Sequence, residues 1–491
     1  MELIPVALYI FFLSFILLYS IAELGLLFNF LFRLRKFRSL NPEPPIKEED
    51  LPKVTIQLPV YNEVYVVERL IDAVAQLDYP VHLLEIQVLD DSTDESAELA
   101  AKRILYWKEN GISIHHIRRN ERTGFKAGAL DYGIRLASGA FIAIFDADFI
   151  PPAYFLRRTI PFFSNEKVGV VQTRWGHLNK NYSLLTRLQA FGLDAHFSIE
   201  QGGRNSAGHF INFNGTAGVW SKSCIEDSGG WSADTLTEDL DLSYRAQLLG
   251  WKFIYLEEIV SPAELPAEMN ALKAQQYRWS KGAAECARKN LGNVLKNPVF
   301  GNATKIQAFF HLLNSFLFIC IFSIGLLTFP VIMVAEKFPE YGNLYSIFSV
   351  FYLSMIFISI YYFASEIHHA KNKVKGFFAF IVLYPVFLCV SMGLSLYNTI
   401  GVLEGYTGRK SAFVRTPKFN ITGKKGTWSK SKYAIQKLRP VVLLEGFFFL
   451  LFGIACFEVA KTGFSLSLVF YGMLTIGYGF VFLGSIIHSK T

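Results

Sequence analysis

The chain has 491 residues, enough for two or three domains, and 52% of them are hydrophobic while only 18% are charged, against roughly 25% charged in soluble proteins. This balance indicates a membrane protein. The five cysteines are scattered without a CxxC pair or zinc spacing, which argues against a disulfide framework or a zinc module. The net charge of +7 is modest, and we expect no nucleic-acid partner.

The first apolar stretch covers residues 3–32 and contains one acid, Glu23. A cleaved signal peptide carries basic residues before its apolar segment, whereas here they follow it. An excess of basic residues marks the cytoplasmic end of a span. We therefore predict a retained transmembrane helix within residues 1–32, followed by a basic, proline-rich linker at 33–53. The basic residues are Arg33, Arg35, Lys36 and Arg38.

Residues 54–300 alternate short strand-like runs with helical stretches, which is typical of an α/β domain with a mostly parallel sheet and helices on both faces. Ligands of such sheets bind at the carboxyl ends of the strands, so we expect the chemistry there. The predicted strands are VTIQLPV (54–60), LEIQVLD (84–90), FIAIFDAD (141–148), VGVVQT (168–173) and WKFIYL (251–256), and helices are predicted at 94–108 and 126–137.

Residues 301–491 are again apolar and predict a membrane region. Segments of spanning length lie near 308–334, 344–366, 440–459 and 464–487.

A further apolar segment, 376–402, lies between two basic stretches. Three lysines at 371, 373 and 375 precede it, and the loop 403–439 carries ten Lys or Arg against one acid, Glu404. Because basic loops remain in the cytoplasm, both ends of this segment should lie inside. We predict an interfacial element at 376–402 and five crossings in total. The alternative is an ordinary sixth span with a basic loop outside.

Asp146 and Asp148 end the predicted strand FIAIFDAD, where positions i and i+2 point to one face. Two carboxylates there suit Mg²⁺ or Mn²⁺, and such an ion offsets the charge that develops on a departing diphosphate. A D-x-D pair alone also fits a simple strand-end turn.

Three further motifs carry polar residues that are ambiguous one by one. Asp90 and Asp91 follow a predicted strand, although Ser92 and Glu95 also match a helix capping box. TED (237–239) opens a predicted helix, with Thr237 as a candidate N-cap. QQYRW (275–279) lies on an amphipathic stretch that also fits a surface helix.

Together, the motifs resemble those of family-2 glycosyltransferases of the cellulose synthase-like kind, especially plant mannan and glucan synthases. The resemblance covers about residues 54–290 and implies a GT-A-type nucleotide-sugar transferase domain at 54–300, embedded in a multi-span α-helical membrane protein. The motifs are QLPVYNE (57–63), DDSTD (90–94), TGFKAGAL (123–130), DAD (146–148), FNGTAG (213–218), TED (237–239) and ELPAEMNALKAQQYRW (264–279).

The resemblance implies a role for each donor-side residue. Pro59, Tyr61 and Glu63 would line the nucleotide pocket, and Asp91 would contact the base. Lys126 would touch the diphosphate. Asp146 would bind the donor and, with Asp148, hold the metal ion, Mg²⁺ or Mn²⁺.

Asp239 would be the catalytic base that takes the proton from the acceptor hydroxyl. In-line attack with a single base inverts the anomeric carbon, so an α-linked donor gives a β product, and no carboxylate nucleophile is needed. Arg278 can fork onto phosphate oxygens, and Trp279 offers a flat face to a sugar ring. The residues expected to contact the acceptor or the diphosphate are Thr237, Glu238, Gln275, Gln276, Arg278 and Trp279.

The segment SAFVRTPK (411–418) resembles the FxVTxK gating loop of bacterial cellulose synthases. Phe413, Thr416 and Lys418 match, whereas Arg415 replaces valine. In that family the loop lies in the cytoplasm, follows an interfacial helix and covers the donor pocket. This arrangement agrees with the topology predicted from charge.

The leading hypothesis is an inverting, metal-dependent synthase that extends a β-linked glucan or mannan processively from a UDP- or GDP-hexose. Several spans suit a protein that passes a polymer through the bilayer. The alternative is a lipid glycosyltransferase that adds one sugar to ceramide or diacylglycerol. An inactive scaffold or export subunit is disfavoured by the intact acidic motifs. The catalytic domain is expected in the cytoplasm, at the plasma (inner) membrane if the source is bacterial.

Overall fold

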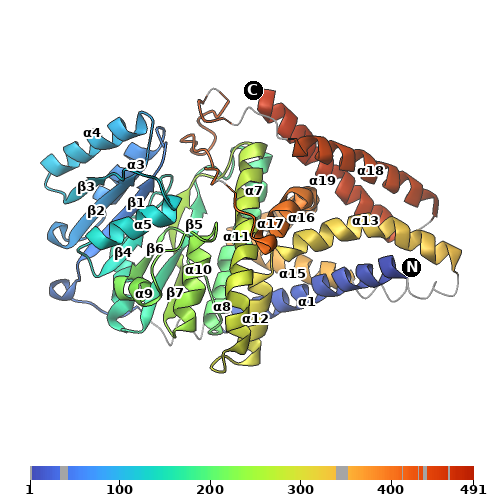
Figure 1. Ribbon diagram of the computed structural model, residues 1–491, viewed down its shortest axis with the longest axis horizontal. Coiled ribbons are helices and arrows are strands. Elements are labelled where there is room, and N and C mark those ends of the chain that lie inside the picture. Colours follow the sequence, from blue (N-terminus) through green and yellow to red (C-terminus); the bar gives the residue numbers. More distant parts are fainter. Residues whose placement is uncertain are drawn as a thin grey trace.

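The chain folds into an α/β domain and a bundle of long helices, which lie at opposite sides of the molecule in Figure 1. Both α1, Ile4–Phe32, and α19, Ser465–Lys490, belong to the helical bundle. The computed structural model describes residues 3–33, 43–338, 352–411, 413–429, 431–434, 440–462 and 465–490. The middle of the predicted linker, with Arg35, Lys36 and Arg38, lies outside these residues.

A seven-stranded mixed sheet in the order β3-β2-β1-β4-β6-β5-β7 forms the centre of the α/β domain. Only β6 runs antiparallel to its neighbours, β4 and β5, so the prediction of a mostly parallel sheet is confirmed. The strands are β1 Val54–Val60, β2 Leu84–Asp90, β3 Ile114–Ile117, β4 Phe141–Ile144, β5 Val168–His177, β6 Gly218–Ser221 and β7 Lys252–Ala263.

Among the differences from the sequence predictions are two additional strands and one helix start. β3 and β6 were not predicted, because each has only four residues and little apolar alternation. Helix α4 begins at Ser96, and Ser92 instead accepts a hydrogen bond from the Asn62 backbone N–H at 2.9 Å. The predicted capping box is therefore wrong, and the Asp94 carboxylate accepts from the Ser96 N–H at 3.0 Å.

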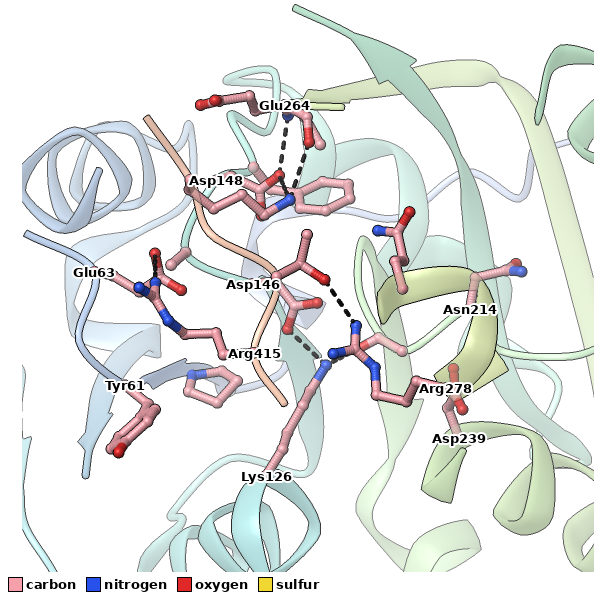
Figure 2. Close-up of a pocket in the computed structure, with 18 of the residues that line it drawn as sticks. Tyr61, Glu63, Lys126, Asp146, Asp148, Asn214, Asp239, Glu264, Arg278 and Arg415 are labelled. Carbon is pink, nitrogen blue, oxygen red and sulfur yellow. Dashed lines mark hydrogen bonds and ion pairs between the residues drawn. The ribbon is translucent and has the colours of Figure 1, made fainter. Parts of the chain in front are cut away.

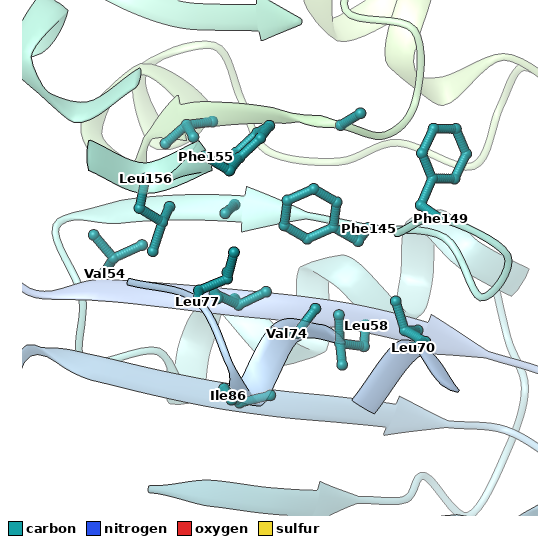
Figure 3. Close-up of a cluster of buried hydrophobic side chains, with 14 of the residues drawn as sticks. Val54, Leu58, Leu70, Val74, Leu77, Ile86, Phe145, Phe149, Phe155 and Leu156 are labelled. Carbon is teal, nitrogen blue, oxygen red and sulfur yellow. The ribbon is translucent and has the colours of Figure 1, made fainter. Parts of the chain in front are cut away.

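One hydrophobic core packs helix α3, Val67–Ala75, against the first strands of the sheet (Figure 3). Leu70 and Val74 of this helix are fully buried together with Leu58 and Ile86 of β1 and β2. Burial of apolar surface stabilises such a core by about 25 cal/mol per Å². The core fixes the strands whose carboxyl ends carry the polar motifs.

The remaining helices of this domain cover the sheet or extend from it. They are α4 Ser96–Glu109, α5 Phe125–Leu136, α6 Phe155–Thr159, α7 Leu184–Ala195, α8 Gly202–Ser206, α9 Lys222–Asp227, α10 Glu238–Leu248, α11 Met269–Lys296 and α12 Asn302–Leu312, with a π-helical turn at His196–Gln201.

Five of the described helices are long and apolar enough to cross a membrane: α1, α13 Phe316–Lys337, α16 Lys373–Gly393, α18 Val441–Thr462 and α19. The chain is therefore an integral membrane protein with several spans. The predicted span 308–334 is divided, because its first residues belong to α12. The predicted span 344–366 falls on α15, Tyr352–His369, and its residues 344–351 lie outside the described part of the chain.

The predicted interfacial element 376–402 corresponds to two helices, α16 and α17, Ser395–Thr407, which meet at Leu394. Leu383 and Tyr384 of α16 share a buried cluster with residues of α7 and α11. Helix α17 lies so close to α11 that a Cβ on Gly405 would stand 2.6 Å from the Lys281 carbonyl oxygen. The length and composition of α16 also fit a span, so its interfacial position remains a prediction.

Candidate active site

A cavity of about 220 Å³ opens at the carboxyl ends of β1, β2 and β4. Figure 2 shows the side chains that converge on it from the sheet, from α5, α10 and α11, and from the loop after α17. Its lining contains all the predicted site residues except Gln276, namely Pro59, Tyr61, Glu63, Asp91, Lys126, Asp146, Asp148, Thr237, Glu238, Asp239, Gln275, Arg278, Trp279, Phe413, Thr416 and Lys418. The motifs of seven separate segments therefore form one site.

Asp146 and Asp148 lie in the turn after β4, which ends at Ile144, rather than on the strand itself. The Lys126 ammonium donates to Asp146 Oδ1 at 2.6 Å, and the Lys418 ammonium donates to Asp148 Oδ2 at 2.7 Å. Asp148 is 4% exposed and also accepts from the Glu264 backbone N–H at 2.9 Å. Two adjacent carboxylates in one cavity fit Mg²⁺ or Mn²⁺, which prefer oxygen ligands.

Asp239 follows Thr237, the N-cap position of α10, and lies in the first turn of that helix. The Thr237 side chain makes no capping bond. Burial, and then the neighbouring charge of Glu238, raises the pKa of Asp239 to about 7, although Lys126 opposes the shift. A carboxyl group with this pKa is well suited to accept a proton near neutral pH.

Gly215 of the FNGTAG motif allows Asp239 to lie close to the chain. Its φ of 78° is one that L side chains rarely adopt, and a Cβ there would stand 3.0 Å from Asp239 Oδ2. Its carbonyl oxygen accepts from the Lys126 ammonium at 2.8 Å. Gly215 therefore contacts both Asp239, the proposed base, and Lys126, the lysine that pairs with Asp146.

We expect the pH dependence of transfer to follow Asp239. Only the carboxylate can accept a proton, so kcat/KM should fall about tenfold per pH unit below pH 7 and level off above it. A pH–rate profile between pH 5.5 and 8.5 measures this limb. The pKa of Glu63 is also raised to about 7, by burial. If Asp239 causes the fall in kcat/KM below pH 7, the Glu63→Gln variant should show the same fall. A wild-type profile that is flat down to pH 5.5 would exclude Asp239 as the base.

Helix α11 presents QQYRW with three of its side chains toward the cavity. Gln275, Arg278 and Trp279 are spaced i, i+3 and i+4 and so share one face, whereas Gln276 points elsewhere. Arg278 donates to the Val414 carbonyl oxygen at 2.6 Å and to Thr416 Oγ1 at 3.3 Å. The guanidinium therefore connects α11 to the loop that resembles a gating loop.

Four residues of this loop line the cavity: Phe413, Arg415, Thr416 and Lys418. Phe413 stacks on Phe125 at a centroid distance of 5.6 Å, and the Arg278 guanidinium lies 4.8 Å from the Phe413 ring centre. Arg415, which departs from the cellulose synthase motif, pairs with Glu63 at 2.8 Å. Together with Lys418 on Asp148, these contacts bind the loop to the strand ends.

Two arginines that were not predicted lie beside Asp91 and Tyr61. Arg119 Nε donates to Asp91 Oδ1 at 3.0 Å, and the Arg122 guanidinium lies 3.4 Å from the centre of the Tyr61 ring. Both belong to the cluster of basic residues just before TGFKAGAL. This cluster is the sequence feature from which they could have been predicted. Glu264 and Asn214 also line the cavity, and both fall inside motifs that the resemblance quoted without a role for them.

Strained backbone is concentrated around this cavity. Among the described residues, four non-glycine residues have positive φ: Asn62, Phe125, Ala217 and Asn420, at 50° to 59°. Asn62 and Phe125 are next to Tyr61 and Lys126 in sequence, and Ala217 is two residues after Gly215. Asn420 lies on the loop that carries Lys418. Such conformations persist where the surrounding structure enforces them, commonly at functional sites.

The fold and the site define a glycosyltransferase, and comparison with known proteins gives the family. Residues 52–282 match Glycosyltransferase like family 2. The chain is 33% identical over 471 residues to glucomannan 4-beta-mannosyltransferase 7 of Arabidopsis thaliana, covering 91% of this chain and 80% of that protein. It is 39% identical over 318 residues to glucomannan 4-beta-mannosyltransferase 1 of Oryza sativa subsp. japonica, covering 62% of this chain and 60% of that protein. The chain belongs to glycosyltransferase family 2, as the motifs predict.

The nucleotide-sugar transferase fold is also confirmed. The structure resembles that of mannosyltransferase PcManGT from Pyrobaculum calidifontis in complex with GDP-Man and Mn²⁺, with a TM-score of 0.52 at 16% sequence identity, covering 81% of this chain and 100% of that one.

Proposed function

We propose that the chain is a processive β-mannan synthase that transfers mannose from a nucleotide donor to the end of a growing glycan, with inversion. The observation that carries this proposal is one cavity containing Asp146, Asp148 and Asp239 beside α11, a helix that also packs against α17 and α19. A glycan end held at Trp279 would thus lie next to the membrane helices. The names of the plant relatives support mannose as the sugar.

The charges of the site suit this reaction. Lys126 and Arg278 would hold the donor diphosphate, with Arg278 able to fork onto phosphate oxygens. Asp239 would take the proton from the acceptor hydroxyl as that oxygen attacks the anomeric carbon from the face opposite the diphosphate. Asp146 and Asp148 would hold Mg²⁺ or Mn²⁺, which stabilises negative charge on the departing diphosphate.

Donor choice and product size test the proposal. Membranes from cells that express the chain should incorporate labelled mannose from GDP-mannose into ethanol-insoluble polymer, and membranes from cells without it should not. Labelled GDP-glucose and UDP-glucose in parallel reactions define the preferred donor. If the product is a single organic-extractable compound carrying one sugar, the chain is a lipid glycosyltransferase and not a polymerase.

We further propose that the loop 403–439 is cytoplasmic and that α16 does not cross the membrane. Support comes from the basic residues on both sides of α16 and from its packing against α7, where Gly192 adjoins Phe387 near the middle of α16. Helices α1, α13, α15, α18 and α19 would then make the five crossings.

Cysteine labelling in intact cells measures this topology. In a background without native cysteines, a cysteine at Gly426, on the exposed loop, is expected to resist an impermeant thiol reagent. A cysteine at the exposed Lys461 at the far end of α18 is the matched control and should react. Reaction at position 426 from outside would contradict the five-crossing topology.

Trp279 should matter more for elongation than for donor turnover. Its half-buried ring at the cavity offers a flat face that can hold a sugar without a fixed hydrogen-bond register. Trp279→Ala is expected to shorten the polymer several-fold while donor hydrolysis changes little, and Trp279→Phe should restore length in part. If Trp279→Ala makes polymer of normal length, Trp279 does not bind the acceptor.

A further inference from the structure

Lys418 and Glu264 form a buried junction between the loop and Asp148. The Lys418 ammonium donates to Asp148 Oδ2 at 2.7 Å and to the Glu264 carbonyl oxygen at 2.9 Å. The Glu264 backbone N–H donates to the same Asp148 oxygen at 2.9 Å. One carboxylate oxygen therefore receives both a lysine from the loop and an amide from the segment after β7.

Glu264 also holds the loop backbone through its side chain. Its carboxylate oxygens accept from the Phe419 N–H at 2.9 Å and from the Ile421 N–H at 3.2 Å. Glu264 is 3% exposed, and Phe419 and Ile421 are buried beside it. Because each of its two oxygens accepts one backbone N–H of the loop, this carboxylate fixes segment 418–421 next to Asp148.

The charges at this junction conflict with a divalent cation. An ion on Asp148 Oδ2 would compete with the two hydrogen bonds that this oxygen accepts and would repel the Lys418 ammonium. The diphosphate of a donor is an anion and would give the displaced ammonium a new partner. Cation binding and the closed position of the loop therefore oppose each other until a nucleoside diphosphate is present.

We propose that Lys418 competes with the divalent cation for Asp148, and that Glu264 couples this competition to the position of segment 413–421. The proposal rests on the metal assignment within the proposed function. Cation alone loosens the segment, and cation with nucleoside diphosphate closes it. Coupling of two binding events is reciprocal, so a chain without the Lys418 charge binds the cation more tightly.

The first test measures Mn²⁺ affinity without nucleotide, by electron paramagnetic resonance of free Mn²⁺. Lys418→Met is expected to bind Mn²⁺ at least about fivefold more tightly than the wild type, within the usual range of coupling between sites. Lys424→Met, an exposed lysine of the same loop, is the matched control and should not change the affinity. Unchanged or weaker binding by Lys418→Met would overturn the proposal.

The second test needs no substitution and follows hydrogen exchange of the Phe419 and Ile421 amides in the intact chain. Mn²⁺ alone is expected to speed their exchange several-fold, and Mn²⁺ with GDP to slow it below the rate without ligands. Glu264→Gln should exchange faster in each condition, because the glutamine NH₂ group would replace one of the two accepting oxygens and would face a backbone N–H. Exchange in the wild type that is unaffected by Mn²⁺ alone would overturn the coupling.

These measurements separate the proposal from the enzyme's sugar specificity and product. Neither depends on which sugar is transferred or on polymer length, so their failure leaves the mannan synthase assignment intact. Mn²⁺ binding by the Asp148→Asn variant tests whether Asp148 is a metal ligand. If the wild type, Asp148→Asn and Lys418→Met all bind no Mn²⁺, both the metal assignment and the competition fail.

Discussion

Replacing Asp239 with asparagine is expected to lower sugar transfer by about 10²–10⁴-fold, the usual contribution of general-base catalysis. The amide has the same shape and fits beside Gly215, but it cannot take a proton from the acceptor. Donor binding, followed by equilibrium titration with a labelled nucleotide, should remain close to wild type. Asp227→Asn, at an exposed position on α9, is the matched control. Turnover near the wild-type rate in Asp239→Asn would assign the base to another residue.

Removing divalent cations should lower transfer at least about 100-fold, since stabilisation of a leaving group by a bound metal ion is worth several kcal/mol. Asp146 and Asp148 supply oxygen ligands in the cavity. Lys126 and Lys418 already pair with these two carboxylates, so the two lysines add little net positive charge toward the diphosphate. Excess chelator followed by Mg²⁺ or Mn²⁺ measures the effect. Full activity in chelator would mean that the two aspartates serve the donor without a metal.

Local sequence predicted the strands and motifs well. β1 and β2 have the predicted bounds because apolar and polar residues alternate along VTIQL and LEIQV. The acidic motifs were ambiguous one by one, and their resemblance as an ordered set to family-2 glycosyltransferases identified them. Helical spacing also explains Gln276, which lies about 160° around α11 from Arg278 and so projects away from it.

Long-range partners could not be predicted from local pattern. Glu264 meets Asp148 across 116 residues, and Lys418 reaches the same carboxylate across 270. Arg415 differs from the gating-loop motif, and only the fold shows that it pairs with Glu63. These contacts depend on the order of strands in the sheet and on the return of the chain from the membrane region.

The most direct test of the proposed function is the product made by the purified chain in lipid nanodiscs with GDP-mannose and Mn²⁺. A processive inverting synthase predicts long chains that an endo-β-1,4-mannanase degrades to short oligosaccharides. Product that resists this enzyme, or that never exceeds one added sugar, would contradict a β-mannan synthase.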